Sequence, residues 1–206
     1  MAKISVLGSG SWGLAWHSCC IIMAMKSFFG RQDRRMPGNS GKKEKILTGF
    51  RGCGFRDEID VLTDLERALK DVDVTVLAVA SPYIRSTAHK MASFVCRDQK
   101  IVNVAKGIEE KTLKTLSEVI EEEIPQGNVA VLSGPSHAEE VGRGLPTTCV
   151  ISAHTQETAE YLQSIFYEPC VPRVYNTGYP WGGTWRSTEK CDRTGSRYCR
   201  RPWIWR

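Results

Sequence analysis

The 206-residue sequence lacks the features that mark membrane, secreted and zinc-binding proteins. No apolar run approaches the roughly 20 residues that a membrane-spanning helix needs, so we expect no membrane insertion. The start of the chain lacks the layout of a secretory signal peptide, which favours a cytoplasmic location and argues against disulfides among the eight cysteines. No Cys-x-x-Cys pair is accompanied by a matching Cys or His pair, so we predict no metal site.

Two segments, residues 16–56 and 177–206, also lack any helical or strand periodicity. They carry the positive charge of the chain, with nine and seven Lys/Arg against two Asp/Glu each, and the rest of the chain is acidic. They also contain five of the eight cysteines and five of the six tryptophans. A basic, Trp-rich tail can bind nucleic acid, so one alternative for the function of this chain is a non-catalytic fragment that binds nucleotides or nucleic acid. Because the tail has no repeating or amphipathic pattern, we expect no nucleic-acid partner.

Elsewhere, strand-like and helix-like segments alternate along the chain. This order predicts an α/β fold with a doubly wound parallel sheet over residues 1–176, followed by a non-native tail at 177–206. Because residues 16–56 do not show the expected second helix and strand, we expect an incomplete sheet with an open edge beside its first strand. The predicted strands cover residues 3–7, 72–79, 100–104, 129–132, 148–152 and 173–175, and the predicted helices cover 62–70, 81–94, 111–123, 136–142 and 155–166.

A Gly-x-Gly-x-x-Gly motif follows the first predicted strand, at Gly8, Gly10 and Gly13. Between a strand and a helix, this motif is typical of Rossmann-like dinucleotide-binding domains, where the glycines permit a tight turn and a close approach of the pyrophosphate. A glycine-rich turn without a ligand is the alternative. The acidic residue that would contact the ribose falls in the patternless segment, and Asp33 does not follow a strand, so both NAD and NADP stay open as cofactors.

Two further segments are expected at the carboxyl edge of the sheet, where such folds bind ligands. Lys106 follows a buried strand and precedes a glycine, so its ammonium group is a candidate for pairing with a phosphate or polarising a carbonyl. A solvated loop lysine is the alternative. Ser136 begins a predicted helix and is a candidate either for substrate binding or for helix capping alone.

In their order and spacing, four motifs resemble those of the bacterial-type NAD(P)-dependent glycerol-3-phosphate dehydrogenases. The resemblance covers residues 1–15 and about 57–176. It implies hydride transfer between NAD(P)H and dihydroxyacetone phosphate, giving sn-glycerol 3-phosphate for phospholipid synthesis. The motifs are Gly-Ser-Gly-Ser-Trp-Gly at 8–13, Val-Ala-Lys-Gly-Ile-Glu at 104–109, Leu-Ser-Gly-Pro-Ser-His-Ala-Glu-Glu-Val at 132–141 and Gly-Leu-Pro-Thr at 144–147.

The resemblance also implies roles for individual residues. Beside the glycines of the first motif, the cofactor would be contacted by Ser11, Trp12 and Ala138. Lys106 would contact both cofactor and substrate, and Gly134 and Ser136 would bind the substrate. Another Rossmann dehydrogenase, acting on a hydroxy acid, is the alternative within the same fold.

The departures from the family suggest that residues 16–56 and the tail are translated out of frame. Codons for the family's Asn-Gly-His-Glu-Val stretch, read one base out of phase, encode the Met-Ala-Met-Lys-Ser found at 23–27. A similar shift of the family's Ala-Leu-Lys-Asn stretch accounts for 188–194, so the family's proton-accepting lysine has no in-frame counterpart and Lys190 does not inherit its role. We expect the helical C-terminal domain to be missing, homo-oligomers to require that domain, and the literal chain to be inactive.

Overall fold

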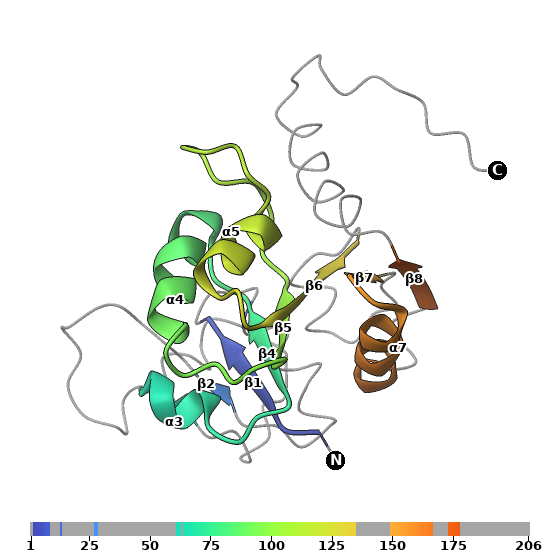
Figure 1. The fold of residues 1–206 in the computed structure, drawn as a ribbon, viewed down its shortest axis with the longest axis horizontal. Coiled ribbons are helices and arrows are strands. Elements are labelled where there is room, and N and C mark those ends of the chain that lie inside the picture. The colour runs from blue at the N-terminus through green and yellow to red at the C-terminus, as the bar shows by residue number, and fades with distance from the viewer. Residues whose placement is uncertain are drawn as a thin grey trace, which may run out of the picture.

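The computed structural model describes residues 2–8, 13, 27–28, 61–62, 64–134, 149–166 and 173–177. Within them lies one eight-stranded sheet of order β3-β2-β1-β4-β5-β6-β7-β8 (Figure 1). The central strands are short apolar runs, β-branched for the most part, and are buried on both faces, as expected of a doubly wound sheet. The strands are β1 (Ile4–Leu7), β2 (Ser27–Phe28), β3 (Val61–Leu62), β4 (Val74–Leu77), β5 (Lys100–Asn103), β6 (Asn128–Ser133), β7 (Cys149–Ala153) and β8 (Arg173–Thr177).

Helices cover both faces of this sheet. One face is packed by α3 (Leu65–Leu69), α4 (Ile84–Met91), which follows the 3-10 turn η1 (Ser81–Tyr83), and α5 (Leu116–Glu123). The other face is packed by α7 (Gln156–Ile165), as Figure 1 also shows. The predicted α/β, doubly wound fold class is therefore confirmed. No helix among the described residues is both long and apolar enough to cross a membrane.

The sheet is parallel from β3 to β6, but its last two strands run the other way. β7 pairs antiparallel with β6, with Ala130 opposite Ala153, while β8 is parallel to β7. The expectation of a wholly parallel sheet is therefore corrected at this edge. An apolar run of four to six residues indicates burial on both faces, and burial alone does not specify the direction of a strand.

The prediction of an open sheet edge beside β1 is wrong. The backbone of β2 pairs in parallel with β1, with Leu7 opposite Phe28, and β3 pairs with β2. Ladder hydrogen bonds use main-chain groups that every residue except proline carries, so a segment without hydrophobic periodicity can still pair. The non-native tail predicted at 177–206 begins one residue too early, because Thr177 belongs to β8. Residues 178–206 lie outside the described residues, as does the predicted helix at 136–142.

The helix predicted at 111–123 is wrong in its first five residues. α5 begins at Leu116 behind a capping box, in which the Glu118 N–H donates to the Thr115 hydroxyl and the Glu118 carboxylate accepts from the Thr115 N–H. Leu113, which lies within the predicted range, has a φ of 59° and is 72% exposed, so it is not part of a helix face. The Thr-x-x-Glu spacing at 115–118 is the sequence signal that marks this start. By contrast, the helix predicted at 155–166 is confirmed as α7, and Thr155 is its N-cap.

Candidate functional site

The carboxyl ends of four neighbouring strands meet at one edge of the sheet. In the parallel register, Leu7 lies opposite Leu77, Leu77 opposite Asn103, and Asn103 opposite Val131. The residues that follow β1, β4, β5 and β6 are therefore adjacent in space. These parallel strands bring Gly8, Lys106 and Gly134 to the same edge, the position at which open α/β sheets bind ligands.

Gly8 ends β1 in a conformation that requires glycine. Its φ is 145°, and a Cβ built on it would lie 2.4 Å from the carbonyl oxygen of Ala78. The N–H of Ala78 donates to the Leu7 carbonyl at 2.8 Å, which holds β1 and β4 together at this point. Any side chain at Gly8 would therefore be driven into the backbone that follows β4.

Gly13 packs its backbone directly onto the turn at Gly8. A Cβ on Gly13 would lie 2.4 Å from the Gly8 carbonyl oxygen and 2.9 Å from its carbon. Gly13 is itself in helical conformation, and its backbone lies in contact with the residue that follows β1. Such a close approach is the role of the third glycine in a dinucleotide-binding turn. Gly10, Ser11 and Trp12 lie outside the described residues.

Lys106 is presented by a short turn after β5. The Val104 N–H donates to the Leu77 carbonyl at 3.1 Å, and the Ala105 N–H donates to Oδ1 of Asn103 at 3.0 Å. Lys106 itself is half-buried, between buried Ala105 and Gly107, whose φ is 112°. Asn103, 3% exposed, thus shapes this turn. Asn103 is not among the predicted site residues, although its polar side chain at the end of an apolar strand is a sequence signal for such a role.

Gly134 follows β6 and is buried at the same edge. Beside it, the Ser133 hydroxyl is buried and finds no hydrogen-bond partner within the described part of the chain. Ser136 and Ala138, which the resemblance associates with substrate and cofactor, lie outside the described residues. Four of the nine predicted site residues are therefore described, and all four, Gly13 included, belong to this sheet edge.

A charged cluster holds the loop that begins with Lys106. The Arg85 guanidinium donates to both carboxylate oxygens of Glu109, at 2.7 and 2.8 Å, and also to Glu122 at 2.9 Å and Glu123 at 2.8 Å. The hydrogen bonds from Arg85 and then from Thr112 lower the pKa of Glu109 from 4.5 to about 2. The carboxylates, Glu109 first, raise the pKa of Arg85. Glu109 therefore remains ionised near neutral pH and is unsuited to act there as a general acid or base.

Among the described residues, the half-buried Lys106 brings one positive charge to the sheet edge that also carries Gly8. A lysine in such a position is suited to bind a phosphate. Within the described ranges, no group of three or more His, Cys, Asp or Glu side chains is placed to hold a metal ion.

Comparison with known proteins agrees with this geometry. Residues 3–159 match the family described as the N-terminus of NAD-dependent glycerol-3-phosphate dehydrogenase. The chain is 45% identical over 183 residues to the glycerol-3-phosphate dehydrogenase [NAD(P)+] of Fusobacterium nucleatum, covering 86% of the chain and 53% of that protein. It is also 45% identical over 185 residues to the enzyme of the same name from Agathobacter rectalis, covering 86% and 52%.

Solved structures show the same fold. A glycerol-3-phosphate dehydrogenase from Coxiella burnetii superposes with a TM-score of 0.73 at 21% identity, covering 86% of this chain and 55% of that one. One from Plasmodium falciparum gives a TM-score of 0.74 at 20% identity, covering 85% and 52%. The chain spans about half the length of the curated relatives it matches. On the family match over residues 3–159, the chain belongs to the NAD-dependent glycerol-3-phosphate dehydrogenase family, corresponding to its N-terminal region.

Proposed function

We propose that this chain is the nucleotide-binding half of an NAD(P)-dependent glycerol-3-phosphate dehydrogenase. The observation that carries the proposal is the backbone contact between Gly8 and Gly13, because it brings the first and third glycines of the motif together at the carboxyl edge of the sheet, as dinucleotide-binding turns require. The absence of side chains at these two positions fits the tight turn and the close helix–strand packing that such a motif requires. The reduced cofactor would donate a hydride to the substrate's carbonyl carbon, and the oxidised cofactor would accept it in the reverse direction.

Residues of the first motif would hold the cofactor in this proposal. Gly8 would permit the tight turn, Gly10 the close approach of the pyrophosphate, and Gly13 the packing of helix against strand. Ser11 and Trp12 would contact the cofactor beside them. Ala138 would make a further cofactor contact. The choice between NAD and NADP depends on a ribose-binding residue that we leave unassigned.

Lys106, Gly134 and Ser136 would bind the phosphorylated three-carbon substrate, dihydroxyacetone phosphate or sn-glycerol 3-phosphate. Lys106 and Gly134 follow the adjacent strands β5 and β6, which supports a shared binding surface. An ammonium group there neutralises phosphate charge and stabilises negative charge that develops on a substrate oxygen. No residue of the chain is assigned the proton transfer, since the family's lysine has no in-frame counterpart in our interpretation. The literal chain would therefore bind ligand without turnover.

Three wider parts of the proposal rest on the sequence. The first is the division into a dinucleotide-binding domain at 1–176, with 16–56 out of frame, and a non-native tail at 177–206. The second is a role in phospholipid synthesis, and the third is a cytoplasmic location. Formation of a homo-oligomer would require a C-terminal domain of the kind that the family resemblance implies.

Titration of the full 206-residue chain with NADH, followed by nucleotide fluorescence, tests the proposal. Lys106→Met is expected to weaken NADH binding about tenfold, the cost of losing one charge-assisted contact. Lys111→Met is the matched control, because it removes the same charge from an exposed position in the same loop. Absence of NADH and NADPH binding by the unmodified chain would refute the nucleotide site. Salt-sensitive binding of DNA or RNA in its place would favour the binding-fragment alternative.

A further inference from the structure

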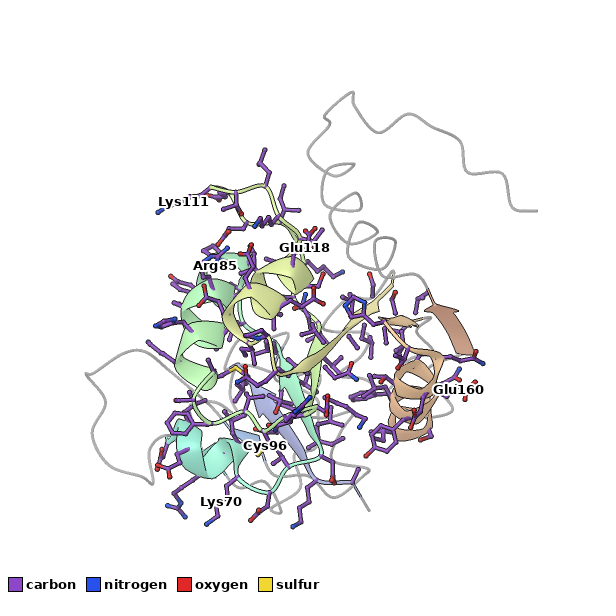
Figure 2. The ribbon with its side chains drawn as sticks, in the orientation of Figure 1. Lys70, Arg85, Cys96, Lys111, Glu118 and Glu160 are labelled. Carbon is purple, nitrogen blue, oxygen red and sulfur yellow. The ribbon has the colours of Figure 1, made fainter. Side chains whose placement is uncertain are left out.

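The Arg85 side chain joins three parts of the molecule that surround the Lys106 turn. We infer that Arg85 is a positioning residue, which fixes the loop at 105–115 so that Lys106 is presented at the sheet edge. The inference rests on the ligand-binding role proposed for Lys106. Arg85 lies in the first turn of α4, and Figure 2 shows it beside α5 and close to the loop whose tip bears Lys111.

The two-point contact with Glu109 fixes the loop at the residue that organises its backbone. Glu109 receives Nε–H and Nη2–H of Arg85 on separate oxygens, a paired geometry that restrains both distance and orientation. The Glu109 N–H donates to the Lys114 carbonyl at 3.0 Å, and the Glu109 carbonyl accepts from the Leu113 N–H at 2.9 Å. A backbone bridge between Ile108 and Thr115 closes the loop.

Glu109 is only three residues from Lys106. The intervening Gly107 has no side chain to limit its backbone and adopts a positive φ of 112°. Gly107 does not by itself hold Lys106 in place. The geometry of the turn therefore depends on the contacts that fix the backbone before it, at the end of β5, and after it, in the loop. On the β5 side, Asn103 supplies this restraint through the Ala105 N–H. On the loop side, Arg85 supplies it through Glu109.

Arg85 is itself held by α5. Its Nη1–H donates to Glu123 and its Nη2–H to Glu122, so all three guanidinium nitrogens have carboxylate partners. Around them, His89 contacts Glu123 at 3.0 Å and Lys114 pairs with Glu122. A lysine at position 85 has a single charged nitrogen and does not reproduce this planar arrangement. We therefore expect both the charge and the planar shape of the arginine side chain to be needed to hold the loop.

A double-mutant cycle between Arg85 and Lys106 tests whether Arg85 acts through the lysine. In the full chain, Arg85→Met is expected to raise the Kd for NADH about three- to tenfold relative to wild type. Arg85→Lys should give a Kd between those of wild type and Arg85→Met. On a Lys106→Met background, Arg85→Met should have no further effect on Kd. Arg97→Met is the matched control, since Arg97 is 91% exposed and its contact with Asp98 is 3.9 Å long.

Hydrogen exchange of the same variants provides a readout that does not need a ligand. Arg85→Met is expected to speed exchange in peptides covering residues 104–115 while leaving β4 and β5 protected. Equal exchange in wild type and variant, or additive effects of the two substitutions on Kd, would overturn the inference. Loss of protection throughout the chain would also overturn it, because Arg85 would then act on global stability. If the wild-type chain binds no NADH, the proposed function fails, and the exchange experiment still decides whether Arg85 fixes the loop.

Discussion

Substituting Gly13 with alanine should test the backbone contact on which the candidate site depends. The new Cβ would lie 2.4 Å from the Gly8 carbonyl oxygen and 2.9 Å from its carbon, closer than real Cβ contacts come. Because both neighbours are backbone atoms, relief requires the backbone at Gly13 and at Gly8 to move apart. Overpacking of this kind costs about 1–3 kcal/mol, whereas alanine in place of glycine in a helix returns at most about 1 kcal/mol. We therefore expect a net loss of about 1–2 kcal/mol in the free energy of unfolding.

Urea denaturation followed by circular dichroism measures this loss as a lower midpoint at an unchanged slope. Gly127→Ala is the matched control. Its Cβ would meet Cδ1 of Ile101 at 2.8 Å, the end of a side chain that can rotate away, so its cost should be smaller. NADH affinity should fall for Gly13→Ala and stay unchanged for Gly127→Ala. A Gly13→Ala chain as stable as wild type, with unchanged NADH affinity, would refute the close-packing argument.

Three further predictions concern the Arg85 cluster and the start of α5. Because the pKa of Glu109 is lowered from 4.5 to about 2, folding favours its ionised form; the resulting stability is present above pH 4.5 and is lost as the pH falls toward 2. With the Glu109 side chain 17% exposed and solvent screening allowed for, this amounts to about 1–2 kcal/mol, so unfolding midpoints measured from pH 6 to 3 should fall less steeply in Glu109→Gln. A double-mutant cycle of Arg85→Met and Glu109→Gln should give a coupling of about 0.5–2 kcal/mol in urea unfolding, and additive effects would contradict the paired contact. Thr115→Ala should cost about 1 kcal/mol through loss of the capping box, and an unchanged midpoint would show that the cap contributes nothing.

The elements that the sequence predicted well are those with two independent signals. The strand at β4 and the helix α7 each combine an apolar pattern with a clear boundary, such as the cap at Thr155. The start of α5 was missed because Leu113 has helical spacing with Leu116, while the capping box at Thr115 overrides that spacing. Periodicity indicates which side chains can share a face, and the local cap decides where the helix begins.

Other features depend on contacts that no local pattern encodes. The reversed direction of β7 is decided by how the chain returns to the sheet after β6, since the apolar sequence of β7 suits either direction. The pairing of β2 with β1 uses main-chain groups and therefore needs no hydrophobic period in Ser27 or Phe28. The Arg85 cluster joins residues 24 to 38 positions apart, so neither its existence nor its partners follow from spacing along one helix.

Ligand binding and turnover should be separable in this chain, because they depend on different parts of it. The binding edge is built from the main-chain contacts of Gly8, Gly13 and the turn before Lys106, all of which lie in segments that match the family. Proton transfer, by contrast, needs a side chain for which we find no in-frame counterpart. We therefore expect the 206-residue chain to bind NADH with an affinity that responds to Lys106 and Arg85, and to show no oxidation of NADH when dihydroxyacetone phosphate is added. Steady oxidation under those conditions would refute this separation, because a group within the chain would then supply the proton.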